Sequence, residues 1–89
     1  MSYINDRIRK CGEFTSQGNN KTNNGSFYLF LVPKSGTQDS VAVVNAKAVE
    51  NAESAEIPLM VGSWNPIVLA SVNLSSDNIS KFRVFWGAE

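Results

Sequence analysis

Residues 26–33 read Ser-Phe-Tyr-Leu-Phe-Leu-Val-Pro, and the six residues from Phe27 to Val32 are all apolar or aromatic. A short apolar run without polar alternation is typical of a strand that is covered on both faces. In a small β-domain one face of this strand packs on the core. The other face then needs a second cover, which the N-terminal segment, a second sheet or another subunit can supply.

The chain beyond Pro33 predicts further short strands with turns between them. These strands are expected at residues 39–44, 57–61, 67–74 and 81–86. Pro58 cannot donate a hydrogen bond to a neighbouring strand, so its strand is expected either to lie at a sheet edge or to begin at the proline. The even spacing of strands and turns predicts an all-β fold: a small antiparallel β-sandwich or barrel of about five or more strands.

The N-terminal part of the chain has a different character. Ile4, Ile8 and Cys11 are spaced so that they share one face of a helix, and Gly12 would end it. Residues 3–10 therefore form either a short amphipathic helix or an extended arm over a neighbouring subunit, since so short a helix is marginal alone. Cys11 is expected to pack beside Ile4 and Ile8, because free cysteine is among the most buried residue types.

Residues 17–25 are rich in asparagine and glycine and end in the turn dipeptide Asn24-Gly25. They predict a flexible linker. The expected organisation is an N-terminal arm or short helix with an Asn-rich linker at residues 1–25, followed by a β-domain at residues 26–89. Residues 45–56 predict a loop with at most one helical turn.

Composition restricts the function. The chain has 89 residues, one cysteine, no histidine, and eight basic residues balanced by eight acidic ones. A domain this small has a thin stability margin and here has no intrachain disulfide to add to it, so self-association is the expected support. The balanced charge makes nucleic acid an unexpected partner. No apolar run approaches the roughly 20 residues that span a bilayer, so no membrane partner is expected.

The residues offer no catalytic constellation. Histidine, the commonest general base, is missing, and no serine has a partner at a motif spacing. Glu50, Glu53 and Glu56 recur every three residues, a spacing that more often marks a solvated face than a calcium site. We therefore expect no enzyme activity, no cofactor and no metal site.

The aromatic residues fit a core together with a subunit interface better than a nucleic-acid stacking platform, although Lys81 and Arg83 flank Phe85. Trp64, in a turn, either folds back over the sheet or anchors a ligand or protein partner. The residues expected at an interface are Ile4, Ile8, Phe27, Tyr28, Phe30, Trp64, Phe85 and Trp86.

Three segments carry a resemblance: the aromatic strand from Gly25 to Val32, the segment from Ile57 to Ile67 with its Pro-Leu and Trp-Asn-Pro motifs, and the ending Trp86-Gly87-Ala88-Glu89. The chain resembles small β-rich bacteriophage virion proteins, namely capsid auxiliary (decoration) and spike-base-like proteins. The resemblance implies a homo-oligomer, with a trimer favoured, that is assembled in the host bacterial cytoplasm and resides in the virion. It also implies binding to the major capsid protein or to a fibre or spike protein.

The alternative is a small ligand-binding β-module for carbohydrate or single-stranded nucleic acid. Such a module would use Trp64 or Phe85, with Lys81 and Arg83 beside it.

Overall fold

A computed structural model describes residues 7–23 and 25–89, which form two antiparallel sheets and one short helix. The elements are β1 (Lys10–Phe14), β2 (Gly18–Asn20), β3 (Tyr28–Pro33), β4 (Val41–Lys47), β5 (Ala55–Met60), β6 (Ser71–Leu74), α2 (Ser76–Lys81) and β7 (Phe82–Ala88).

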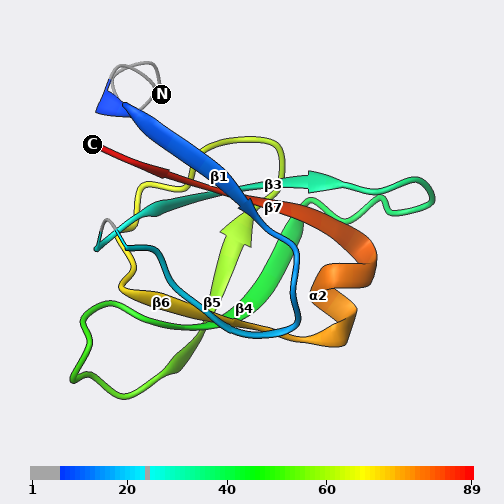
Figure 1. The fold of residues 1–89 in the computed structure, drawn as a ribbon. Coiled ribbons are helices and arrows are strands. Elements are labelled where there is room, and N and C mark those ends of the chain that lie inside the picture. Colours follow the sequence, from blue (N-terminus) through cyan, green and yellow to red (C-terminus); the bar gives the residue numbers. More distant parts are fainter. Residues whose placement is uncertain (1–6, 24) are drawn as a thin grey trace.

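The two sheets lie in two layers (Figure 1). One sheet has the strand order β1-β7-β3 and the other has the order β2-β6-β4-β5. Every pair of neighbouring strands is antiparallel. The predicted small all-β antiparallel fold is therefore confirmed.

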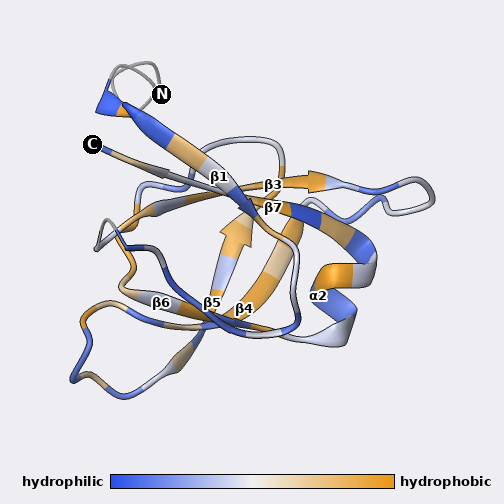
Figure 2. Cartoon of the chain, viewed as in Figure 1, coloured by the Kyte–Doolittle hydropathy of each residue, from blue (hydrophilic) through white to orange (hydrophobic). Residues whose placement is uncertain are grey.

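The aromatic stretch forms β3, at one edge of the three-stranded sheet. Its inward side chains, Leu29 and Leu31, and that of Phe27 just before the strand are at most 1% exposed and belong to the core between the sheets. Its outward side chains, Tyr28 and Phe30, are half-buried, as is Val32. Apolar residues gather along the strands (Figure 2), so the hydrophobic effect drives the two layers together.

The linker prediction is wrong for residues 18–20, because they form β2 and pair with β6. Lys10–Phe14 likewise forms β1 and pairs with β7 over its whole length. Both segments have weak strand propensity. Pairing with the open edges of β6 and β7 satisfies their backbone groups, and this tertiary context decides their conformation. Residues 10–20 are thus part of the same two sheets as the rest of the chain.

One part of the N-terminal prediction is wrong, and another part lies outside the described residues. Cys11 is exposed rather than packed as a small hydrophobe. The reason is strand alternation in β1, which turns Cys11 outward while its neighbour Phe14 is buried in the core. Ile4 and half of the predicted helix, residues 3–6, lie outside the described residues.

Helix α2 replaces part of a predicted turn. The Ser75 hydroxyl accepts from the Asn78 backbone N–H (3.0 Å), and the Asn78 side chain accepts from the Ser75 N–H (3.1 Å), which is a capping box. Asn78 Nδ2 also donates to the Val43 carbonyl (3.1 Å), on the part of β4 that β6 does not reach. Within the described residues no helix is long and apolar enough to cross a bilayer.

The remaining strand predictions hold with shifted bounds. In β4 the side chains alternate between the two faces of the sheet: Val41 and Val43 are exposed, whereas Ala42 and Val44 are buried. The strand containing Pro58 is an edge strand, as predicted. Of the predicted strand 67–74, only Ser71–Leu74 is regular, because the preceding residues turn aside to bond Phe27 through Leu69.

Candidate interaction surface

Strand register gathers aromatic side chains on the outer face of the three-stranded sheet. Phe30 lies opposite Phe85, and Tyr28 lies opposite Gly87. Because side chains of directly paired residues share a face, Tyr28, Phe30 and Phe85 all point away from the core. All three are half-buried in this chain. We call this surface, completed by Trp64, the aromatic face.

Trp64 joins this face through the loop that follows β5. The Gly62 N–H donates to the Leu31 carbonyl (2.8 Å), so the loop runs along the open edge of β3. The Trp64 ring meets Phe30 edge-to-face, with ring centroids 5.2 Å apart. Such pairs contribute roughly 0.5–1.5 kcal/mol beyond their buried area. Trp64 therefore folds back onto the sheet, on its outer face rather than at an open end.

Gly87 makes room for this arrangement. A Cβ atom at residue 87 would stand 2.7 Å from Trp64 Cη2 and 2.6 Å from Ile8 Cδ1. Both distances are well below van der Waals contact, so only glycine allows the tryptophan and isoleucine to lie over β7. Two side chains from distant parts of the sequence, Trp64 and Ile8, thereby cover Gly87 near the C-terminal end of β7.

Asn65 holds the Trp64 loop in place. Its side chain is buried, and its Oδ1 accepts from the Met60 N–H at 2.7 Å. Its Nδ2 donates to the carbonyls of Met60 (3.1 Å) and Leu29 (3.2 Å). The Asn65 N–H adds a bond to the Leu29 carbonyl (3.0 Å). One buried amide thus ties the end of β5 to β3 and sets the position of Trp64.

An ion pair lies beside Phe85 on the aromatic face. Arg83 donates from Nε and Nη2 to the two carboxylate oxygens of Glu13, at 3.1 and 3.0 Å. These hydrogen bonds, and then the positive charge of Arg83, lower the pKa of the Glu13 carboxyl, while Glu13 raises the pKa of Arg83. The guanidinium carbon also lies 5.0 Å from the Phe85 ring centroid. The arginine charge on this face is therefore already matched within the chain.

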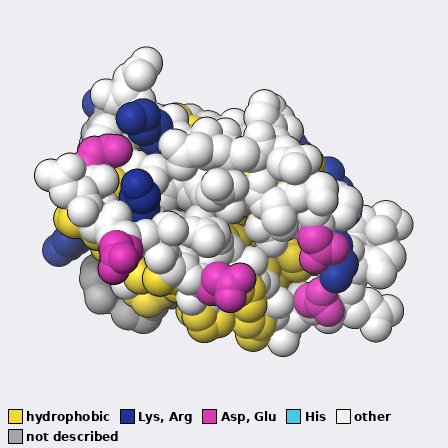
Figure 3. Space-filling model, turned by 90° about the horizontal axis from the view of Figure 1, so that it is seen from below, with side chains coloured by type: hydrophobic (Ala, Val, Ile, Leu, Met, Phe, Trp, Pro, Cys, Tyr) yellow, Lys and Arg dark blue, Asp and Glu magenta, His cyan; other side chains and the backbone are white. Residues whose placement is uncertain are grey.

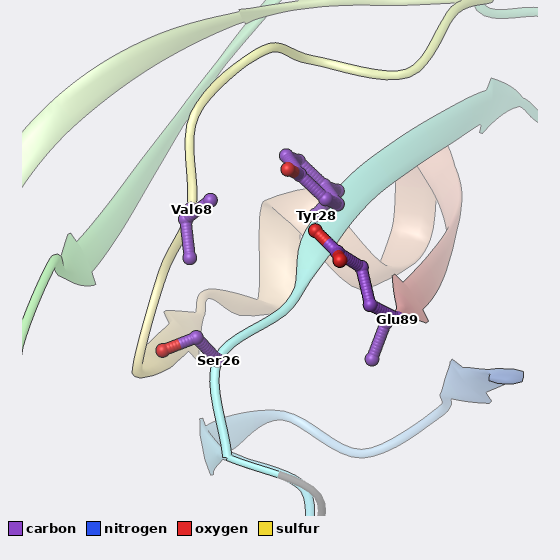
Figure 4. Close-up of a pocket in the computed structure, with 5 residues that line it drawn as sticks. Ser26, Tyr28, Val68 and Glu89 are labelled. Atoms are coloured by element: carbon purple, nitrogen blue, oxygen red, sulfur yellow. The ribbon is translucent and has the colours of Figure 1, made fainter. Parts of the chain in front are cut away.

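A shallow pocket of about 240 Å³ lies at the end of the aromatic face, beside Tyr28. Its lining residues are Ser26, Tyr28, Val68, Ala88 and Glu89. In Figure 4 the side chains of Tyr28 and Glu89 lie together, across the pocket from Val68 and Ser26. Nowhere in the described ranges do three potential metal ligands come together. The side chains that line the pocket offer one carboxylate, from Glu89, and two hydroxyls, from Ser26 and Tyr28. The pocket is open to solvent.

The structure divides the predicted interface residues into two groups. Tyr28, Phe30, Trp64 and Phe85 lie together on the aromatic face, with Ile8 half-buried beside Trp64 over Gly87.

Phe27 and Trp86 face the other way, into the protein. Phe27 is 1% exposed in the core, so it has no surface to offer a partner. Trp86 packs against the core and lies over Gly12, where a Cβ would stand 2.7 Å from its Nε1. The strand period explains both positions, because adjacent residues alternate between the two faces. Ile4 lies outside the described residues.

Three positions that shape this surface were missed in the sequence: Asn65, Gly87 and Glu13. The Asn-Pro pair after Trp64 marked a turn but not a buried amide. Nothing in the Trp86-Gly87 dipeptide indicated that Trp64 and Ile8 lie over the glycine. Lys81, expected beside Phe85, forms ion pairs with Asp39 (3.7 Å) and Asp77 (3.5 Å) instead.

Comparison with known proteins adds no assignment: no family model, curated protein or solved structure matches the chain.

Proposed function

We propose that this chain is a non-enzymatic structural protein of a bacteriophage virion, which binds the capsid and itself. It would be a capsid auxiliary (decoration) protein or a component at the base of a head fibre or spike. The observation that carries the proposal is the aromatic face: Tyr28, Phe30, Trp64 and Phe85 gathered on one outer sheet face and only half-buried by their own chain.

Aromatic rings in this arrangement suit a protein partner. Aromatic residues are enriched at protein interfaces, and tryptophan and tyrosine dominate the binding energy there. Each additional Å² of apolar surface that a partner removes from water contributes roughly 25 cal/mol. The face is also held rigid by the Asn65 bonds and by Trp64 on Phe30, so little conformational entropy is lost on binding.

The same geometry disfavours the ligand-binding alternative. Trp64 packs on Phe30 and over Gly87, so one side of its ring already has a partner. A stacking platform for nucleic acid needs unmatched positive charge beside the rings. Here Glu13 pairs with Arg83 next to Phe85, and two aspartates pair with Lys81.

The test is incorporation into particles of the phage that encodes the chain. We expect mass spectrometry of gradient-purified virions to detect the protein at many copies per particle. A Phe85→Lys variant should lose incorporation, whereas Val49→Lys, at an exposed loop position distant in sequence from the aromatic face, should be incorporated normally. Absence of the wild-type chain from purified particles would contradict the proposal, as would normal incorporation of folded Phe85→Lys protein.

A further inference from the structure

The outer face of the β4–β5 hairpin carries an apolar patch on the other sheet. Val41 is paired with Met60 and Val43 with Pro58, and all four side chains are exposed. The exposed fractions of Val41, Val43 and Met60 are 52%, 52% and 49%. Solvent-facing strand positions are usually polar, so such a cluster on a sheet face marks a contact surface. We call these four residues the hairpin patch.

Polar and charged residues border the hairpin patch at one end. Asn45 and Lys47 follow Val43 at alternate positions of β4, and Glu56 precedes Pro58 on β5 directly opposite Asn45. Lys47 and Glu56 form no ion pair with any residue that the structure describes. Figure 3, seen from below, shows hydrophobic side chains gathered on this side of the molecule with acidic groups around them.

We propose that a second copy of this chain covers the hairpin patch, in a twofold-symmetric dimer whose axis runs along the strands between β4 and β5. This inference deepens the proposed function, on which its role in assembly rests, by naming a partner and a surface separate from the aromatic face. A twofold interface must be self-complementary, since the same surface is used by both copies.

The strand register supplies this self-complementarity. Rotation about the proposed axis places each β4 residue of one copy above its β5 partner in the other. Val41 then meets Met60 of the second copy, and Val43 meets Pro58. Asn45 meets Glu56, so that an amide donor faces a carboxylate. Apolar residues therefore contact apolar residues along the axis, and no like charges meet.

The charged end is complementary as well. Lys47 is two residues beyond Asn45, roughly 7 Å along the strand from the point where Glu56 of the second copy lies. A lysine side chain spans that distance. Each dimer would thus contain two equivalent Lys47–Glu56 pairs between copies, using two groups that have no ion pair in the described part of a single chain.

The size of the surface sets the expected strength. Only β4 and β5 of each copy overlap about this axis, because β5 is the edge of its sheet. Two strands spaced about 4.8 Å apart and about 20 Å long over their six paired positions present roughly 200 Å² per copy, near 400 Å² in total. Interfaces below about 1,200 Å² are weak or transient. We therefore expect a weak dimer, with a dissociation constant of about 0.1–1 mM. A contact of this strength becomes effective on a shell, where binding of many copies raises the local concentration.

The first test is sedimentation velocity of the purified chain over concentrations from about 20 µM to 2 mM. Wild-type protein should shift from monomer to dimer, and Val43→Lys should raise the dissociation constant at least about tenfold. Phe85→Lys, on the opposite sheet, should leave the dimer unchanged. A wild-type monomer throughout, or a dimer lost in Phe85→Lys and kept in Val43→Lys, would overturn the inference.

A charge reversal tests the geometry of the axis. Lys47→Glu and Glu56→Lys should each weaken the dimer, because like charges then meet between copies. The double variant restores opposite charges and should recover wild-type association. Failure of the double variant to recover, with its fold intact by circular dichroism, would exclude the proposed axis. Particle incorporation is measured separately, so loss of the dimer in Val43→Lys and loss of incorporation in Phe85→Lys report on different proposals.

Discussion

Replacement of Asn65 tests whether one buried amide holds the Trp64 loop on β3. In an Asn65→Ala variant the Met60 N–H loses its acceptor, and the carbonyls of Met60 and Leu29 lose a donor. The Leu29 carbonyl keeps the Asn65 N–H as a partner, so the main cost comes from the unpaired Met60 N–H. An unsatisfied buried donor costs roughly 1–3 kcal/mol, to which the other lost bonds add.

We expect Asn65→Ala to lower the free energy of unfolding by about 2–3 kcal/mol. A domain of this size has a total stability of roughly 5–13 kcal/mol, so the variant should still fold. Each kcal/mol shifts Tm by about 4–8 °C in a domain of this length, which gives a decrease of about 8–24 °C. Thermal unfolding followed by near-UV circular dichroism measures this change and also reports on the packing of the tryptophans.

Asn65→Asp makes the prediction dependent on pH. Its carboxylate would face the Leu29 and Met60 carbonyls in a buried site, so the pKa of the new carboxyl should be raised in the folded state. A raised carboxyl pKa means that the variant is least destabilised below the unfolded pKa of about 3.9 and loses stability as pH rises toward the folded pKa.

The difference in stability between Asn65→Asp and wild type should therefore grow between about pH 4 and pH 7, while the Asn65→Ala difference stays constant. A constant Asn65→Asp difference across this range, or an Asn65→Ala decrease in Tm below about 3 °C, would refute the role given to this side chain.

Three further outcomes follow from single contacts. Gly87→Ala should lower the free energy of unfolding by about 1–3 kcal/mol, because its Cβ would collide with Trp64 and Ile8; an unchanged denaturant midpoint would contradict this packing. Glu13→Gln should remove a stabilising contribution that is present above the unfolded pKa of glutamate and is lost as pH falls through the lowered folded pKa. The free energies of unfolding of wild type and variant should therefore converge in acid. Free energies that differ by the same amount at every pH would exclude the Arg83 pairing as the source. Cys11 should react with a maleimide reagent in the native protein as fast as in the denatured one, and protection in the native monomer would contradict its exposure on β1.

The sequence predicted the exposure of side chains correctly where the two-residue period of a strand alone decides which face a residue occupies. Val41 to Val44 are all apolar and alternate in exposure as the strand period requires, and Pro58 predicted an edge strand by its missing donor. The inward turn of Phe27 and the outward turn of Phe30 could not be told apart in a run without polar residues. The bridge of Phe27 to Leu69 and the pairing of Phe30 with Phe85 of β7 decided which face each side chain occupies.

The candidate surface was readable only in part. Aromatic residues at Tyr28, Phe30, Trp64 and Phe85 were recognised as interface candidates, but nothing local showed that they meet. Their meeting depends on contacts between distant segments, namely Asn65 with β3 and Trp64 with Gly87. A strand glycine carries no signal of the side chain that lies over it.

The amino-acid sequence by itself determined the all-β character, the apolar strand that begins near Phe27, and the lack of histidine and of paired cysteines, because these depend on residue type and short-range periodicity. Tertiary structure decided that residues 10–14 and 18–20 become strands, that Asn78 donates a hydrogen bond to Val43 where β6 does not reach β4, and that four aromatic rings share one face. Each of these outcomes depends on contacts between residues that are far apart in the chain. Such contacts stabilise the protein only once both sheets have formed.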